Sequence, residues 1–385
     1  MIKFVSRPNI IYLVQLIIWN VLRKIEKIII SEVFDFGSST IFSLLMFIGE
    51  FLAGLILTRY QNKFLNTRSS TLTNTSTRTT INLIQNQNEI TRPDNVFILY
   101  ILLFITAFYD FVEFTLSVSY LGKFYNISGS LESRLGGILT ISAALFFYFL
   151  LKFQIFKHQF FSLLTIGICL ILVIISEFIF QEIDIFLSYG KFVGALFIIF
   201  LIHFFNSLLD SIEKYLFEYD YFNPFKTLMW EGFFGTIITL IYCFIDNYFN
   251  KLVIYYNNKS TGKFVGLIFL LFLYIILCGG RNAFRVVTNK IYSPMVKSLT
   301  DYLLNPIYDI IEFSRGKDYL SFGKRNIGYF IINLILSLII TICGCVYNEF
   351  IVLFCCKLEY NTHHEISQRA SIVLENIDDN FDDDD

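Results

Sequence analysis

The stretch LLDSIEKYLFEYDYFNPFKTLMWEGFFG, residues 208–235, decides the fold of this chain. It closes one long apolar run with acidic residues and a lysine, turns at Asn223 and Pro224, and opens the next apolar run at Trp230. Proline fixes its own backbone torsion and restricts the residue before it, so this dipeptide is typical of a turn between two helices. The stretch therefore predicts a chain that folds back on itself between two apolar segments.

The amino-acid composition indicates a membrane protein. Of the 385 residues, 55% are hydrophobic and only 16% are charged, and the mean hydropathy is +0.60. In soluble domains roughly a quarter of all residues are charged, and a single apolar core stops growing at about 250–300 residues. An excess of apolar side chains this large needs lipid as its solvent. The net charge of −2 also argues against the basic face that a nucleic-acid partner would require.

Apolar runs of about the length of a membrane-spanning helix recur along the whole chain. Lipid offers no hydrogen bonds to an open backbone, so these long continuous runs predict helices rather than strands. The ten runs cover residues 9–22, 38–57, 96–120, 131–151, 160–180, 191–212, 227–249, 264–283, 295–313 and 327–354. The first run is the shortest, and nine spans are the alternative if it does not cross.

Two segments lack the apolar residues of a folded core. Residues 59–95 are rich in Ser, Thr, Asn and Gln, and residues 357–385 end in DDNFDDDD. Such compositions cannot bury enough apolar surface to offset the entropy of ordering, so we expect a disordered loop and a disordered acidic tail. Most Lys and Arg residues lie at the two ends or in loops on the side of the N-terminus, which favours a cytosolic C-terminus.

A weak internal repeat relates the two halves of the chain. The matching segments are EFLAG at 50–54 with EGFFG at 231–235, SLESR at 130–134 with SPMVK at 293–297, and SEF at 176–178 with NEF at 348–350. The three matches occur in the same order, each five spans apart. An odd number of spans per half places the halves in opposite orientations, as in many secondary transporters. We therefore expect two inverted five-helix repeats, residues 1–180 and 181–356.

The same segments resemble the drug/metabolite transporter superfamily, and within it the nucleotide-sugar-transporter and EamA-like solute carriers. The resemblance lies in FIGEFLAG at 47–54, SGSLESRLGGILTISAALFF at 128–147, EKYLFEYDYFNPFKTLMWEGFFG at 213–235, SPMVKSLTDYL at 293–303 and VYNEF at 346–350. It implies ten helices around a central cavity that the fourth and ninth helices line, and it implies a carrier. The FYNN and GALNK-like signatures of nucleotide-sugar carriers are absent, so the resemblance leaves the cargo open.

Charged residues inside the apolar runs predict a polar cavity. A charged side chain at mid-membrane costs about 2.5–3.5 kcal/mol on insertion scales, so such residues face a cavity or one another. Side chains three or four positions apart share a helical face, as do Asp110 with Glu113 and Lys297 with Asp301. The predicted substrate-binding residues are Asp110, Glu113, Ser130, Arg134, Lys297 and Asp301.

Arg134 and Lys297 occupy matching positions in the two halves, and three interpretations of them stay open. They form a two-cation cradle for an anionic solute, in which the guanidinium binds a carboxylate or phosphate through two parallel hydrogen bonds. Alternatively they form internal salt bridges, Arg134 with Asp110 or Glu113, and Lys297 with Asp301. In the third interpretation both side chains extend to the membrane surface.

Four other acidic residues are candidates for coupling or gating. Glu50 and Glu231 match in the repeat and can titrate as proton-coupling groups, with structural roles at helix ends as the alternative. Asp210 and Glu213 lie near the end of a span beside Lys214. We expect these to form a cytosolic gate or a solvated rim.

The sequence lacks the signatures of membrane enzymes and ATP-driven pumps. It has no Gly-x-Gly-Asp motif of an aspartyl protease, no histidine boxes among its four histidines, and no GxxxxGK[ST] loop. We predict a chain that is not an enzyme and holds no cofactor or metal. The predicted function is secondary-active, alternating-access transport of a small polar or anionic solute across an endomembrane, such as Golgi, ER or a lysosome-like organelle, or the plasma membrane. A non-transporting multispan receptor or scaffold is the alternative, and a homodimer is compatible with either.

Overall fold

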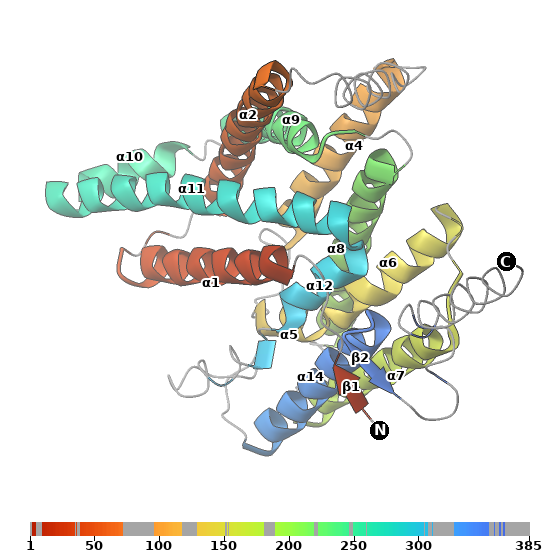
Figure 1. Ribbon diagram of the computed structural model, residues 1–385. Helices are drawn as coiled ribbons and strands as arrows, with labels where there is room; N and C mark the ends of the chain where they lie inside the picture. The colour runs from red at the N-terminus through yellow and green to blue at the C-terminus, as the bar shows by residue number, and fades with distance from the viewer. Residues whose placement is uncertain are drawn as a thin grey trace, which may run out of the picture.

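The chain is almost wholly α-helical in the part that the computed structural model describes (Figure 1). The described residues are 2–4, 10–34, 36, 39–71, 96–117, 129–150, 152, 154–180, 189–218, 222–245, 249–258, 260–303, 305–306, 310, 327–353, 358, 362 and 365. Within them the predicted all-α class is confirmed.

Each predicted apolar run begins in or beside a helix. The first half holds α1 (Ile10–Glu32), α2 (Ser39–Thr71), α4 (Val96–Thr115), α5 (Gly129–Arg134), α6 (Gly137–Leu150) and α7 (Lys157–Phe180). The second half holds α8 (Tyr189–Glu218), α9 (Pro224–Ile245), α10 (Phe249–Asn258), α11 (Thr261–Ile291), α12 (Pro294–Leu303) and α14 (Ile327–Tyr347). The sequence did not predict α10.

Seven of the described helices are long and apolar enough to cross a membrane: α2, α4, α7, α8, α9, α11 and α14. They support an integral membrane protein. α6 is apolar but has 14 residues, and α12 has 10. α1 is longer, but Arg23, Lys24, Glu26 and Lys27 interrupt its apolar character.

The fourth predicted span is broken into two helices. α5 ends at Arg134, Leu135 and Gly136 form a turn, and α6 begins at Gly137. The amides of Ile138 and Leu139 donate to carbonyls three residues earlier instead of four. Glycine is a weak helix former because it loses more backbone entropy than other residues, so a pair of glycines favours this break.

α2 is longer than the sequence predicted. It continues to Thr71, so residues 59–71 of the segment predicted to be disordered are helical. Arg, Gln and Lys have long side chains that keep most of their freedom in a helix, and they occur throughout this extension. Gln61 also accepts a hydrogen bond from Asn223 at 2.8 Å. Residues 72–95 lie outside the described residues, as does the tail 357–385 apart from three positions.

The predicted turn at Asn223 and Pro224, between the sixth and seventh apolar runs, is confirmed. α8 ends at Glu218 and α9 starts at Pro224, the first helical position, where a missing amide hydrogen costs nothing. The side chain of Asn223 caps the new helix by accepting a hydrogen bond from the Phe225 amide at 2.9 Å.

The helices pack in a connected bundle. α2 packs on α9 and α11, α9 also packs on α4, and α1 packs on α11. α8 packs on α4 and α6, α6 packs on α7 and α12, and α14 packs on α7 and α12. Glycines allow the closest approaches: Gly232 lies against the backbone of Phe51, and a Cβ atom at Gly54 would lie 2.5 Å from the Met229 nitrogen. Small residues at helix contacts are typical of membrane bundles.

The start of the chain pairs with the segment that follows α14. Strand β1 (Ile2–Phe4) runs antiparallel to β2 (Ile351–Leu353), with Ile2 opposite Leu353. The two strands lie side by side at one end of the bundle, near α7 and α14 (Figure 1).

Candidate functional site

A polar cavity of about 170 Å³ lies among α1, α2, α4, α8, α11 and α12. Its lining is dominated by ionisable and polar side chains in a chain that has few of them. The lining cations are Arg23, Lys27, Arg281, Arg285 and Lys297, the carboxylates are Asp110 and Glu113, and the other lining residues are Met46, Phe114, Ser117, Asn206 and Leu209. Charge is costly in lipid, so these helices turn it inward.

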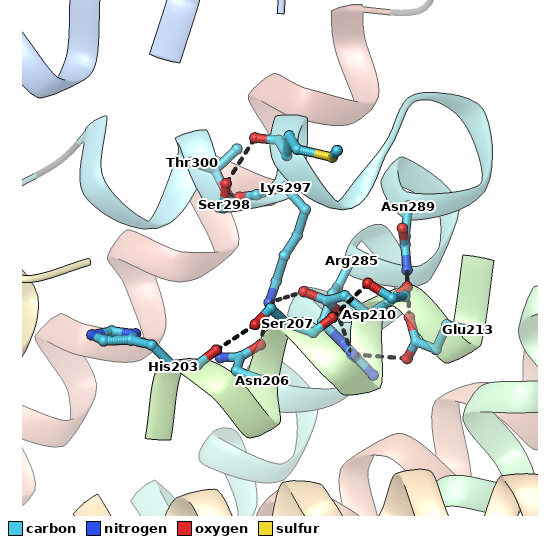
Figure 2. A network of polar contacts seen from close by, with 12 residues as sticks. His203, Asn206, Ser207, Asp210, Glu213, Arg285, Asn289, Lys297, Ser298 and Thr300 are labelled. Carbon is cyan, nitrogen blue, oxygen red and sulfur yellow. Dashed lines mark hydrogen bonds and ion pairs between the residues drawn. The ribbon is translucent and has the colours of Figure 1, made fainter. Parts of the chain in front are cut away.

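Asn206 on α8 joins the two sides of this cavity. Its side-chain nitrogen donates to Glu113 on α4 at 3.3 Å, and its side-chain oxygen accepts from the Lys297 ammonium group on α12 at 2.8 Å. Three helices that are far apart in sequence therefore meet at one amide. Figure 2 shows Lys297 extending from α12 to reach Asn206 and Asp210 together.

One wall of the cavity is a buried ion-pair cluster, which we call the Arg285 cluster: Asp210, Glu213, Glu231, Arg285 and Lys297. The guanidinium of Arg285 lies 2.8 Å from Glu213, 3.3 Å from Glu231 and 3.5 Å from Asp210. Lys297 binds the other Asp210 oxygen at 2.8 Å. Each of the five is at most 5% exposed as a side chain. Three carboxyl groups thus share two cations away from water.

Further hydrogen bonds hold the end of α8 against the end of α11. Asn289 donates to the Asp210 carbonyl at 2.9 Å and to the Glu213 carboxylate at 2.8 Å. Lys214 donates to the carbonyl of Tyr292 at 3.1 Å. Asp210, Glu213 and Lys214 are all buried, so the predicted solvated rim is wrong for these residues because helix α11 covers them.

Glu50 and Glu231 lie inside their helices rather than at helix ends. Glu50 on α2 is 1% exposed, and one of its oxygens accepts a hydrogen bond from Asn282 on α11. Glu231 on α9 is 3% exposed and binds Arg285. Both carboxyl groups therefore belong to the polar centre of the α2, α9 and α11 contact.

Arg134 lies in a different cluster from Lys297. Its guanidinium forms an ion pair with Glu177 on α7 at 3.1 Å, donates to the Tyr329 hydroxyl on α14, and lies 5.1 Å from the centroid of the Tyr329 ring. Arg134 does not line the cavity. The structure therefore does not bring Arg134 and Lys297 together as a cradle.

The internal pairing that the structure has also differs from the pairs that the sequence suggested. Arg134, the last residue of α5, binds Glu177 on α7 and Tyr329 on α14 rather than Asp110 or Glu113 on α4. Lys297 binds Asp210 across to α8. The predicted site residues Ser130 and Asp301 lie in α5 and α12, but their side chains are outside the described residues.

Sequence reasoning missed nine of the lining residues, among them Arg23, Lys27, Asn206, Arg281 and Arg285. Arg281 lies in the last turn of the predicted span 264–283 and Arg285 just beyond it, and the helix continues past both to Ile291. The two cations of α1 follow the first predicted span, inside a helix that ends at Glu32. Their four-residue spacing places each pair on one helical face, and this was the available signal.

Glu26, beyond the apolar part of α1, is a buried acid that differs from those of the Arg285 cluster. It is 3% exposed, and neither carboxyl oxygen has a hydrogen-bond partner in the part of the chain that the structure describes. Burial disfavours the charged form and raises the pKa of Glu26 from its ordinary 4.5 to about 7.

A scan against models of protein families finds no match for this chain, and a search of curated proteins finds none either. The geometry of the cavity therefore carries the functional argument.

Proposed function

We propose that this chain is a secondary-active carrier that moves a small anionic solute through the polar cavity. The observation that carries the proposal is the lining, in which five cations and two carboxylates surround about 170 Å³ of space between apolar helices. Arg285 and Lys297 are held by the carboxyl groups of the Arg285 cluster, and the other three lining cations, Arg23, Lys27 and Arg281, still outnumber Asp110 and Glu113. A concave site with an excess of one charge concentrates ions of the opposite charge. Pockets for drug-sized ligands measure about 300–1,000 Å³, so this smaller cavity suits a small metabolite.

Lys27 is the lining cation whose charge is most available to a solute. In the described part of the chain it has no carboxylate within ion-pair distance, and it lines the cavity, with Glu132 as an acid whose charge acts on it from farther away. Arg285 and Lys297 are instead held by Asp210 and its neighbours. An anion that enters the cavity therefore meets an ammonium group that no ion pair holds, and such a group is a strong hydrogen-bond donor to carboxylate or phosphate oxygens.

The packing of the helices supports two inverted five-helix repeats. The repeat matches α1, α2, α4, α5–α6 and α7 with α8, α9, α11, α12 and α14. Contacts then occur in equivalent pairs: α2 on α11 with α9 on α4, α1 on α11 with α8 on α4, and α6 on α7 with α12 on α14. In addition α2 packs on α9, α6 on α12 and α7 on α14, each helix on its own counterpart. A twofold axis between the halves requires this pattern.

Contacts of the repeat glutamates follow the same symmetry. Glu177 near the end of α7 binds Tyr329 at the start of α14. Its counterpart Glu349, just past the end of α14, lies 3.5 Å from His158 at the start of α7. Each half thus contributes one acidic residue to the same kind of contact with the other half.

The pairing of β1 with β2 bears on the number of crossings. Because the two strands share a sheet, an even number of helices must cross the membrane between them. Among the described helices the seven long apolar ones are an odd number, so, counting these helices alone, we expect an odd number of α1, α5–α6 and α12 to cross as well. Ten spans result when all three cross. If the basic residues set the N-terminus in the cytosol, the C-terminus is also cytosolic, in an endomembrane or the plasma membrane.

The experiment is a binding screen followed by one variant pair. Purified protein in detergent is heated with inorganic phosphate, monocarboxylates, dicarboxylates, phosphorylated sugars, amines and neutral sugars, and stabilisation by anions alone is expected. Lys27→Gln abolishes this stabilisation. Lys263→Gln, at the exposed start of α11, retains it as the matched control. Absence of stabilisation by any anion would favour the receptor or scaffold.

A further inference from the structure

The Arg285 cluster contains one more carboxyl group than cations. Asp210, Glu213 and Glu231 face Arg285 and Lys297, and all five side chains are buried. An ionised carboxylate without a compensating cation is very unfavourable away from water, and such a group takes up a proton instead. The cluster therefore reaches neutrality when one carboxyl group is protonated.

The contacts identify which carboxyl groups stay ionised. Asp210 has Lys297 on one oxygen and Arg285 on the other, at 2.8 and 3.5 Å. Glu213 has Arg285 on one oxygen and the Asn289 amide on the other, both at 2.8 Å. Each of these four oxygens has a cation or a hydrogen-bond donor, although the Glu213 oxygen beside Arg285 has that ion pair alone and no hydrogen bond within the described residues. Asp210 and Glu213 are thus held as carboxylates.

Glu231 and the nearby Glu50 each have one unoccupied oxygen. Oε1 of Glu231 and Oε2 of Glu50 are buried and have no hydrogen-bond partner within the described residues. The Thr106 hydroxyl, which lies near Glu231, donates to the Leu103 carbonyl at 2.8 Å. Each unoccupied oxygen is a place where a proton can reside.

The charged groups around these two acids come from four helices. Glu213 on α8, Arg285 on α11 and Glu50 on α2 face Glu231. Asp110 on α4, Arg281 and Arg285 on α11, and Glu213 on α8 face Glu50. Arg285 interacts with both Glu231 and Glu50, so a proton that binds at either acid changes how strongly Arg285 is held.

Resting on the carrier function proposed above, we propose that solute transport is coupled to a proton that binds at Glu231, with Glu50 as the neighbouring proton site. Arg285 is the link, because it both binds Glu231 and lines the cavity. Protonation of Glu231 removes one of the three negative charges that face Arg285, so this wall of the cavity becomes less negative and repels an anion less. Proton and anion then favour each other's binding, and both travel in the same direction as symport.

This coupling also balances charge. An anion that moves alone carries its charge through the membrane centre, whereas an anion and a proton together carry one negative charge less. The proton binds a Glu231 oxygen from one side of the membrane and leaves that oxygen to the other side, and no bond of the solute changes. An inward gradient of one pH unit can then concentrate a symported monovalent anion about tenfold.

The test has two readouts, of which the first needs no solute. Infrared spectra of the purified chain near neutral pH should show a protonated-carboxyl band that Glu231→Gln weakens and Glu218→Gln, on the exposed end of α8, leaves unchanged. Glu26→Gln identifies the part of the band that belongs to Glu26. Glu50→Gln is the second variant if Glu231→Gln does not fold. A band that neither Glu231→Gln nor Glu50→Gln changes overturns the proposal.

The second readout is proton movement in proteoliposomes. Phosphate, succinate and lactate are added outside vesicles that contain a pH-sensitive dye, and anion uptake is measured in parallel. Symport predicts internal acidification with uptake, and loss of the acidification in Glu231→Gln. Anion uptake without acidification overturns the coupling and leaves the carrier function intact. Absence of uptake for all three anions, together with no stabilisation in the binding screen, overturns both.

Discussion

Gly232 on α9 lies directly against the backbone of Phe51 on α2. Each residue follows a buried glutamate, Glu231 or Glu50, and the two glutamates match in the internal repeat. Equivalent residues that touch each other lie on a twofold axis. In the inverted repeat that we propose, the axis would pass between α2 and α9, where this contact lies.

Substitution of Gly232 by Ala should destabilise the protein, because a Cβ atom there would overlap the nitrogen and Cα of Phe51. Overpacking of this kind costs about 1–3 kcal/mol. The measurement is thermal unfolding in detergent. Gly262→Ala is the matched control, since a Cβ atom there meets nothing within 4 Å. Equal melting temperatures for the two variants would contradict the close α2–α9 contact.

Lys297→Gln should lower both stability and anion uptake, because Lys297 holds Asp210 and also lines the cavity. Removing one partner of a buried ion pair costs about 3–5 kcal/mol. A second substitution, Asp210→Asn, should restore much of the stability, because it removes a carboxylate that only Arg285, at 3.5 Å, then holds, but uptake should stay low. Recovery of uptake along with stability would assign Lys297 a structural role only.

Arg134→Gln distinguishes the ion pair of Arg134 with Glu177 from the two-cation cradle that the sequence suggested. It leaves Glu177 buried without its cation, so the unfolding temperature falls, and the double variant with Glu177→Gln recovers it. In that double variant the apparent KM for the anion should equal that of the wild type, since Arg134 does not line the cavity. A KM raised tenfold or so, about 1.4 kcal/mol of lost binding, would return Arg134 to the solute site.

Glu26→Gln should change how stability depends on pH. Burial raises the pKa of Glu26 to about 7, so the folded chain holds this proton more tightly than the unfolded chain does. Wild-type stability therefore falls as pH rises from about 4.5 to 7, and the glutamine variant escapes this fall. Relative to wild type, its melting temperature should rise by about 1–3 °C between pH 5 and pH 8. An identical difference at both pH values would show that Glu26 is not buried as a neutral acid.

Local patterns predicted the helices and the central turn well. A long apolar run in lipid satisfies its backbone hydrogen bonds by forming a helix. The Asn223-Pro224 pair stops one helix and caps the next within a few residues. Helix ends were less predictable. The apolar run 264–283 stops before Arg285, which predicts that this residue lies in a loop. The backbone nevertheless continues as helix to Ile291.

The partners of the charged residues could not be predicted, since they depend on contacts far apart in sequence. Glu177 lies 43 positions from Arg134, and Asp210 lies 87 positions from Lys297. The sequence offered Lys297 an acid one turn away and Arg134 acids in the adjacent span. In the packed structure both cations bind other acids. The internal repeat suggested equivalent roles for the two cations, but the structure places them in different clusters.

Counterflow in proteoliposomes tests the central claim most directly, because only a carrier exchanges a trace solute against an internal pool without an imposed gradient. Vesicles are loaded with an anion that stabilises the purified chain, and the labelled anion is added outside. We predict transient accumulation of label above the external concentration, which Lys27→Gln abolishes and Lys263→Gln retains. Label that only equilibrates, or accumulation that survives the loss of Lys27, would contradict transport through this cavity.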